Sequence, residues 1–205
     1  MVSSGLSERV DVSQYRLALH LSVAFAILSL LVWLALEGRG NRLGFARESV
    51  AVGARRRAAF LVGLVFAQVV LGAFVAGLKA GLVYNTWPSM NGQLVPSDYW
   101  SEGRGLLSLF ESHAATQFNH RLTAYVLLIA ALIQAWCVYA SRKEGRVRTS
   151  AFALAAAVVV QALLGIWTLL AHVPLSLGLV HQAGAAIVMA MAVWHVHATR
   201  RPAVA

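Results

Sequence analysis

The sequence predicts an all-α integral membrane protein with five transmembrane helices. Of its 205 residues, 59% are hydrophobic and 12% are charged, whereas soluble domains average about 45–50% apolar and about 25% charged residues. The apolar residues gather in five runs, each about as long as the roughly 20 residues that a helix needs to cross a bilayer. A spanning segment has to be helical, because lipid offers backbone groups no hydrogen-bond partner.

The five runs define the predicted helices in chain order. The first follows a polar opening, and the later runs are separated by polar or basic connections, of which the one between the second and third runs is long. The runs cover about residues 15–36, 58–78, 118–140, 150–171 and 175–195.

Basic residues mark one side of the membrane. Six arginines lie in residues 37–57, the segment "SRKEGRVR" joins the third and fourth runs, and "HATRRP" follows the fifth. All three segments fall on one side of a five-helix serpentine, so the positive-inside rule predicts a cytoplasmic C-terminus, with residues 79–117 outside. The net charge of +9 comes largely from these connections, so it indicates topology and no nucleic-acid partner.

Internal similarity predicts a repeat. Gln68 and Gln161 each begin a Q-x-x-L-G motif inside an apolar run, and His20 and His181 each follow a valine by eight residues. These matches favour a parallel repeat about an axis along the membrane normal. The chain would then hold one four-helix bundle half plus the last helix of a preceding half. We expect the two glutamines to bond across helices rather than to perform chemistry.

Three histidines are the candidate ligands. His20, His120 and His181 each lie near the outer end of an inward-running helix, about one turn inside the apolar zone. Two imidazoles at equal depth can occupy both axial positions of a haem iron in a helical bundle, and Arg121 is placed to meet the propionates. A single histidine of this kind is more often an interfacial polar residue. Three at a matched depth favour ligation.

Other polar and aromatic residues near the surface are expected to serve the interface. His113 is expected to be solvated, His172 to lie at an outer helix end, and His195 and His197 to be interfacial. The expected interfacial aromatic belt is Tyr84, Trp87, Tyr99 and Trp100, and the expected solvated carboxylates are Asp98, Glu102 and Glu111. Among these, Glu111 is close enough to the helix mouth to hydrogen-bond near a haem.

Four segments carry a resemblance to a known family. "GLKAGLVYNTWPSMNGQLVPSDYW" is followed by "LFESHAATQFNHRLTAY", "LLGIWTLL" and "VHQ". These segments resemble the haem A synthase family, which serves cytochrome c oxidase assembly. Because the outer loop lacks a cysteine pair, the chain is most similar to the mitochondrial and alphaproteobacterial branch.

The resemblance implies a fold, an activity and a ligand set. Family members have eight helices in two halves, and the C-terminal half holds haem b (iron) through histidines that match His120 and His181, with Arg121 beside them. The N-terminal half binds the substrate haem o and oxidises a ring methyl to a formyl group, giving haem A. His20 matches a ligand of that substrate haem. The enzyme would be an oxidoreductase of the bacterial cell inner membrane, surrounded by membrane lipid.

The chain departs from the family at its N-terminal side. A Glu-x-x-His-Arg motif expected in the substrate half is absent, and its analogue here is the segment 117–121, with glutamine in place of glutamate. The first two helices and most of the third are expected to be missing. Residues 1–57 would be the tail of the substrate half and 58–205 the haem b half. Catalytic residues are then unknown and expected in the missing half, so this chain alone is expected to bind haem b and to make no haem A.

Two other classes of function stay open at this stage. One is a haem b electron-transfer subunit unrelated to haem synthesis, and the other is a cofactor-free membrane assembly factor. A haem spectrum would separate the second from both haem hypotheses. For the haem A synthase hypothesis, the partners that the resemblance allows are haem o synthase, an electron donor and a second copy of the chain.

Overall fold

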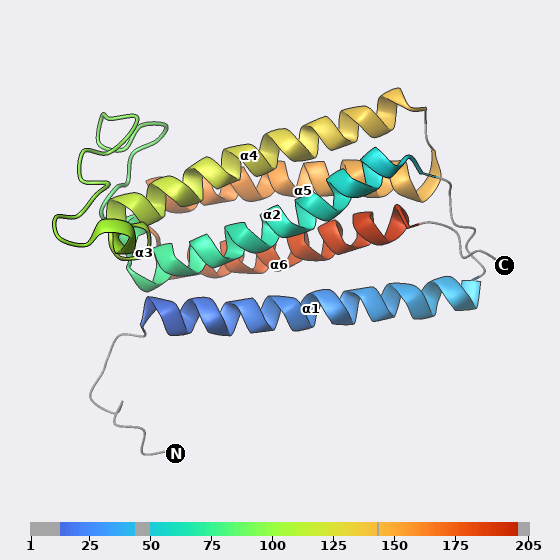
Figure 1. Ribbon diagram of the computed structural model, residues 1–205, viewed down its shortest axis with the longest axis horizontal. Coiled ribbons are helices and arrows are strands. Elements are labelled where there is room, and N and C mark those ends of the chain that lie inside the picture. The colour runs from blue at the N-terminus through green and yellow to red at the C-terminus, as the bar shows by residue number, and fades with distance from the viewer. Residues whose placement is uncertain (1–12, 44–49, 143, 201–205) are drawn as a thin grey trace, which may run out of the picture.

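The computed structural model describes residues 13–43, 50–142 and 144–200, and this part of the chain is helical apart from its connections (Figure 1). Five long helices run back and forth, and three short helical segments lie in or beside the long connection. In order the elements are α1 Gln14–Leu43, α2 Val52–Gly77, η1 Ala80–Leu82, η2 Gly105–Leu107, α3 Ser108–Glu111, α4 His113–Ala140, α5 Gly145–Leu170 and α6 Leu175–Ala198.

The five predicted spans are confirmed as helices. Each of the five long helices is long and apolar enough to cross a membrane. Several begin earlier than predicted: α2 starts at Val52 instead of about residue 58, and α5 at Gly145 instead of about residue 150. The predicted runs excluded charged residues and therefore began after the arginines that α2 and α5 include. Arginine can stay in a helix at a membrane surface, because its long apolar stem carries the charge outward.

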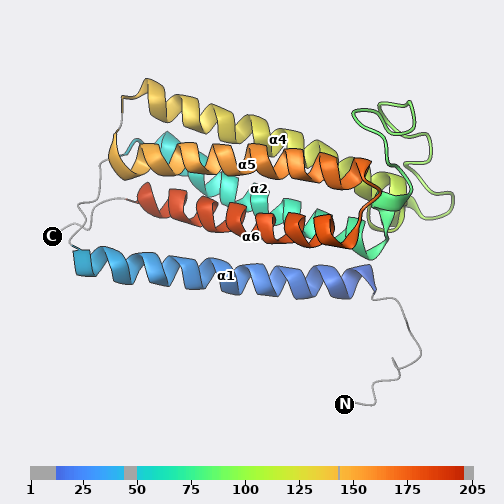
Figure 2. The ribbon, with the colours of Figure 1, turned by 180° about the vertical axis from the view of Figure 1, so that it is seen from behind.

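Four helices pack around one core, and the fifth lies along their side. In both views α1 runs beside α6 and the remaining helices lie beyond (Figures 1 and 2), and its contacts are with α2 and α6. The core joins Leu61 of α2, Leu127 of α4, Leu154 of α5 and Met189 of α6 with Phe25 of α1.

The bundle has two different ends. At one end lie the long connection 78–112 and the first turns of α1, α4 and α6; we call it the loop end (Figure 1). At the other, the arginine end, α2 and α5 begin with basic residues such as Arg57 and Arg148. The candidate histidines lie at the loop end, since His20, His120 and His181 are the seventh, eighth and seventh residues of their helices.

The long connection folds onto α4 through a buried tyrosine. Tyr84 is 6% exposed, and its hydroxyl donates a hydrogen bond to Asp98. Burial, followed by this bond to a carboxylate, raises the pKa of Tyr84 from 10.0 to about 12. The prediction that Tyr84 belongs to an exposed aromatic belt is therefore wrong, whereas Trp87 and Trp100 are exposed as expected. The polar sequence around Tyr84 does not indicate that this loop folds back onto the bundle and buries the ring.

A polar network closes the arginine end, and it corrects a second prediction. His195 is fully buried. Its Nε2 lies 2.8 Å from Nε2 of Gln134 and its Nδ1 2.9 Å from Oγ of Ser150, while Arg57 donates to Oε1 of Gln134 at 2.8 Å. His195 and its neighbour His197 were predicted to be interfacial, but both are buried, because the helices around α6 extend past the predicted ends of the apolar runs.

Candidate functional site

His120 is held against α2 by a glutamine. Gln68 Nε2 lies 3.1 Å from His120 Nδ1, 3.3 Å from its Nε2, and donates to the His120 carbonyl oxygen at 3.1 Å. The imidazole also packs against Gly72, where an added Cβ would stand 3.1 Å from the ring atom Cε1. The position of this ring therefore depends on an amide partner and on the absence of a side chain one turn further along α2.

His181 is held in the same way against α5. Gln161 Nε2 lies 3.1 Å from His181 Nδ1 and donates to the His181 carbonyl oxygen at 2.8 Å. A Cβ added at Gly165 would stand 2.8 Å from the His181 Cε1 atom. The contacts of His120 are thus repeated at His181.

The repeated Q-x-x-L-G motif accounts for both arrangements. Residues four apart in a helix lie on one face, so the glutamine bonds the histidine while the glycine leaves room for its ring. The prediction that Gln68 and Gln161 bond across helices is confirmed. The role of Gly72 and Gly165 was not predicted, although both glycines stand in the repeated Q-x-x-L-G motif.

The two histidines have the chemistry that a haem site requires. The two rings come from different helices, α4 and α6, at the same end of the bundle. Two imidazoles suffice for a haem, because the porphyrin supplies the remaining iron ligands. Within residues 13–43, 50–142 and 144–200, no group of three or more His, Cys, Asp or Glu side chains could hold a bare metal ion.

Arg121 follows His120 and points to the long connection. Its guanidinium donates to the carbonyl oxygens of Ser89 at 3.2 Å and Tyr84 at 3.1 Å. Its Nε is buried without a hydrogen-bond partner among the described residues. A buried donor of this kind is costly unless an acceptor reaches it. A haem propionate is an acceptor of suitable charge.

His20 does not join the histidine pair. It lies on the exposed face of α1, with Leu19, Val23 and Ile27, whereas Ala18 and Phe25 lie on the face that packs against the bundle. The structure therefore separates His20 from His120 and His181. It presents an imidazole on an apolar surface that the described residues leave uncovered.

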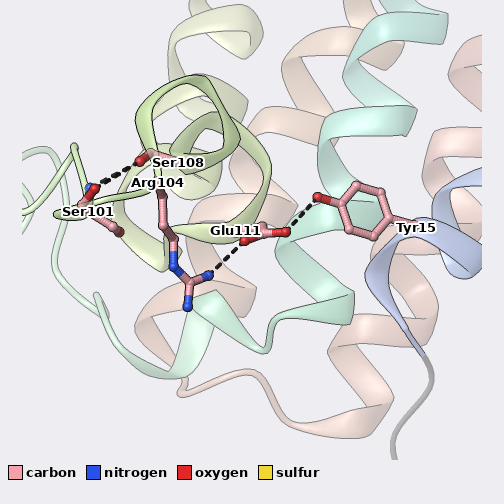
Figure 3. A network of polar contacts seen from close by, with 5 residues as sticks. All are labelled: Tyr15, Ser101, Arg104, Ser108 and Glu111. Carbon is pink, nitrogen blue, oxygen red and sulfur yellow. Dashed lines mark hydrogen bonds and ion pairs between the residues drawn. The ribbon is translucent and has the colours of Figure 1, made fainter.

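Glu111 links α1 to the long connection. Its Oε1 accepts a hydrogen bond of 3.0 Å from the Tyr15 hydroxyl, and its Oε2 pairs with Arg104 at 2.8 Å (Figure 3). Beside them, the Ser101 backbone N–H donates to Oγ of Ser108 at 3.1 Å (Figure 3). Glu111 thus holds the first turn of α1, the helix that carries His20.

The remaining loop-end histidines lie outside the site. His113 is exposed, as expected of a solvated residue, and His172, expected at a helix end, is exposed directly after α5. The site thus consists of two histidines, their glutamines and glycines, and an arginine whose Nε is buried.

Fold and site together define an all-helical protein of the integral membrane class, with a pair of histidines at one end of its bundle. The chain belongs to the cytochrome oxidase assembly protein family, whose model matches residues 1–193.

The relatives have one name in common. The chain is 50% identical to the Heme A synthase of Maricaulis maris over 199 residues, which are 95% of this chain and 56% of that protein. It is 48% identical to the Heme A synthase of Caulobacter vibrioides, covering 98% and 58%, and 46% identical to that of Parvibaculum lavamentivorans, covering 96% and 55%. The chain thus spans little more than half the length of these relatives. No solved structure matches the chain.

Proposed function

We propose that the chain supplies the haem b-binding part of a haem A synthase, with His120 and His181 as the axial ligands. The observation that carries this proposal is the repeated arrangement of histidine, glutamine and glycine at one end of the bundle. The name shared by the relatives supports the reaction.

The side chains divide the work of holding the cofactor. When bound by two histidines, haem b has no open iron position and supplies electron transfer. Gly72 and Gly165 leave the space that the two rings occupy, and Arg121 offers its unused Nε–H to a propionate. The long connection, held by hydrogen bonds from Arg121, covers this end of the bundle.

The substrate in this proposal is haem o, bound on the other side of α1. His20 is its ligand from this chain, and residues 1–57 belong to the substrate half while 58–205 form the haem b half. Oxidation of a methyl to a formyl group, with water as the source of the oxygen atom, releases protons and electrons, so the reaction requires an electron acceptor. No residue of this chain is assigned to that chemistry.

The proposed location is the bacterial inner membrane, with the loop end outside and the C-terminus in the cytoplasm. Arginines near the start of α2 and α5 support this orientation, because positive charge gathers on the cytoplasmic side of a membrane protein. Haem o synthase is a candidate partner, since it would deliver the substrate.

A chimaera tests the reaction. In the Heme A synthase of Maricaulis maris, the region matched by this chain would be replaced with the chain, and extracted haem would be analysed for its formyl group. We expect the chimaera to form haem A, and the His20→Ala chimaera to lose haem A while keeping its haem b spectrum. A chimaera that binds haem b at normal levels but forms no haem A would contradict the proposed reaction and favour a separate electron-transfer role.

A further inference from the structure

The carboxamide of Gln161 occupies a space that a glycine makes for it. A Cβ added at Gly184, three residues after His181 on the same helix, would overlap Gln161 Oε1 and stand 3.2 Å from its Cδ. Any side chain at position 184 would therefore displace this amide. Gly165 leaves room for the His181 ring, and Gly184 leaves room for the Gln161 amide. The positions of both side chains in this pair therefore depend on a glycine.

We infer that Gln161, and Gln68 at the second histidine, are positioning residues that hold the imidazoles through Nδ1 and thereby set the reduction potential of the haem. This inference rests on the proposed function, because it needs His120 and His181 to be ligands. It adds a role for the glutamines beyond packing.

The chemistry of the imidazole requires such a partner. When Nε2 bonds iron, the ring proton lies on Nδ1, and that N–H needs an acceptor. An N–H that is taken out of water without an acceptor is costly. The acceptor has to come from a neighbouring helix. In both pairs the group within reach of Nδ1 is the glutamine amide.

The glutamine amide is within reach of Nδ1 but has to turn over to accept its proton. Its Nε2 lies 3.1 Å from Nδ1 and donates to the carbonyl oxygen of the histidine residue in both pairs. When the amide turns over, Oε1 accepts from Nδ1–H, and the bond from Nε2 to the carbonyl oxygen is given up. At Gln68 this oxygen is buried and has no partner within the described part of the chain. The Gln68 amide also lies 3.3 Å from Nε2 of His120, so this Nε2 is open to iron only if the His120 ring turns away from the amide.

The hydrogen bond has a measurable consequence for the iron. An acceptor at Nδ1–H makes the imidazole a stronger donor, which stabilises the ferric haem and lowers its reduction potential. Loss of a group that hydrogen-bonds a metal ligand commonly costs about tenfold or more in metal affinity or activity. We expect about a tenfold rise in the ratio of reduced to oxidised haem at a fixed ambient potential, which corresponds to about 59 mV for a one-electron couple.

The test is a potentiometric titration of the haem-loaded chain, followed by its optical spectrum. Gln161→Leu removes the acceptor and should raise the potential, whereas Gln161→Glu keeps an acceptor and should leave it at or below the wild-type value. Gly184→Ala displaces the amide without altering it and should act like Gln161→Leu. Gly178→Ala is the matched control on the same helix, because nothing lies within 4 Å of its Cβ position. Gln68→Leu should shift the potential in the same direction as Gln161→Leu.

The outcomes separate this inference from the proposed function. A wild-type chain without a low-spin haem spectrum would overturn the proposed function. A normal wild-type spectrum, together with an unchanged potential in both Gln161→Leu and Gly184→Ala, would overturn the positioning role alone. If Gln161→Leu fails to bind haem, restored binding in Gln161→Glu supports the role, and failure of both variants with normal binding in Gly178→Ala contradicts it.

Discussion

Replacing Gly165 with alanine should weaken haem binding by pushing one ligand aside. The new Cβ would stand 2.8 Å from the Cε1 atom of His181, whereas ordinary contacts begin at 3.4 Å. The imidazole therefore has to move by about 0.6 Å, since repulsion rises steeply inside the contact distance. The backbone of α5 cannot yield instead, because it lies in a packed helix.

The expected magnitude follows from the cost of overpacking. Inserting a methyl group into a filled site costs about 1–3 kcal/mol. If that cost falls on the ligand, haem affinity drops by about 5- to 150-fold. Gly72→Ala should have a smaller effect, because its Cβ would stand 3.1 Å from the His120 ring.

The assay is a titration of the detergent-solubilised chain with haem, followed by its main absorption band. Gly63→Ala is the control, because nothing lies within 4 Å of the Cβ position and the same gain in helix propensity applies. Equal haem affinity in Gly165→Ala and Gly63→Ala would refute the reasoning, since the ring of His181 would then not occupy this space in the loaded protein.

Three further predictions concern other parts of the chain. His195→Ala should lower the stability measured by thermal unfolding in detergent by about 0.6–1.7 kcal/mol, the range for hydrogen bonds between membrane helices, and leave the haem spectrum unchanged; an altered spectrum would contradict a purely structural role. Because the folded state raises the pKa of Tyr84 to about 12, its contribution to stability should be full below pH 10 and disappear as the pH rises through 12. Ultraviolet titration should show the ionisation of Tyr84 near pH 12 in the wild type and not in Tyr84→Phe. The same titration curve at that pH in both proteins would show that the bond to Asp98 does not form in solution. Reporter fusions at Gly92 should be external and those at Arg148 cytoplasmic, and the reverse pattern would overturn the orientation.

The parts of the fold that hydropathy controls could be predicted from the sequence. All five long helices appear where the apolar runs lie, because a membrane-spanning segment has no alternative to the helix. The histidines of α4 and α6 could be singled out because an ionisable residue in an apolar run is costly. The pairing of Gln68 and Gln161 with neighbouring helices could be predicted in the same way, because an amide in an apolar run also needs a hydrogen-bond partner.

The features that could not be predicted from the sequence depend on which helices and loops contact one another. Nothing in the run around His195 indicates that Gln134 and Ser150 come from two other helices to satisfy it. Tyr84 likewise stands in a polar connection whose return to α4 is a tertiary event. The room at Gly184 depends on where Gln161 lies across the interface, and no local pattern specifies that position.

The proposed function depends on His120 and His181 holding one haem b between them. The most direct measurement is a reduced-minus-oxidised optical spectrum of the purified, haem-loaded chain, compared with His120→Ala, His181→Ala and the exposed control His172→Ala. We expect a low-spin spectrum typical of two histidine ligands in the wild type and the control, and its loss in both ligand variants. A low-spin spectrum that persists unchanged in either His120→Ala or His181→Ala would contradict the account.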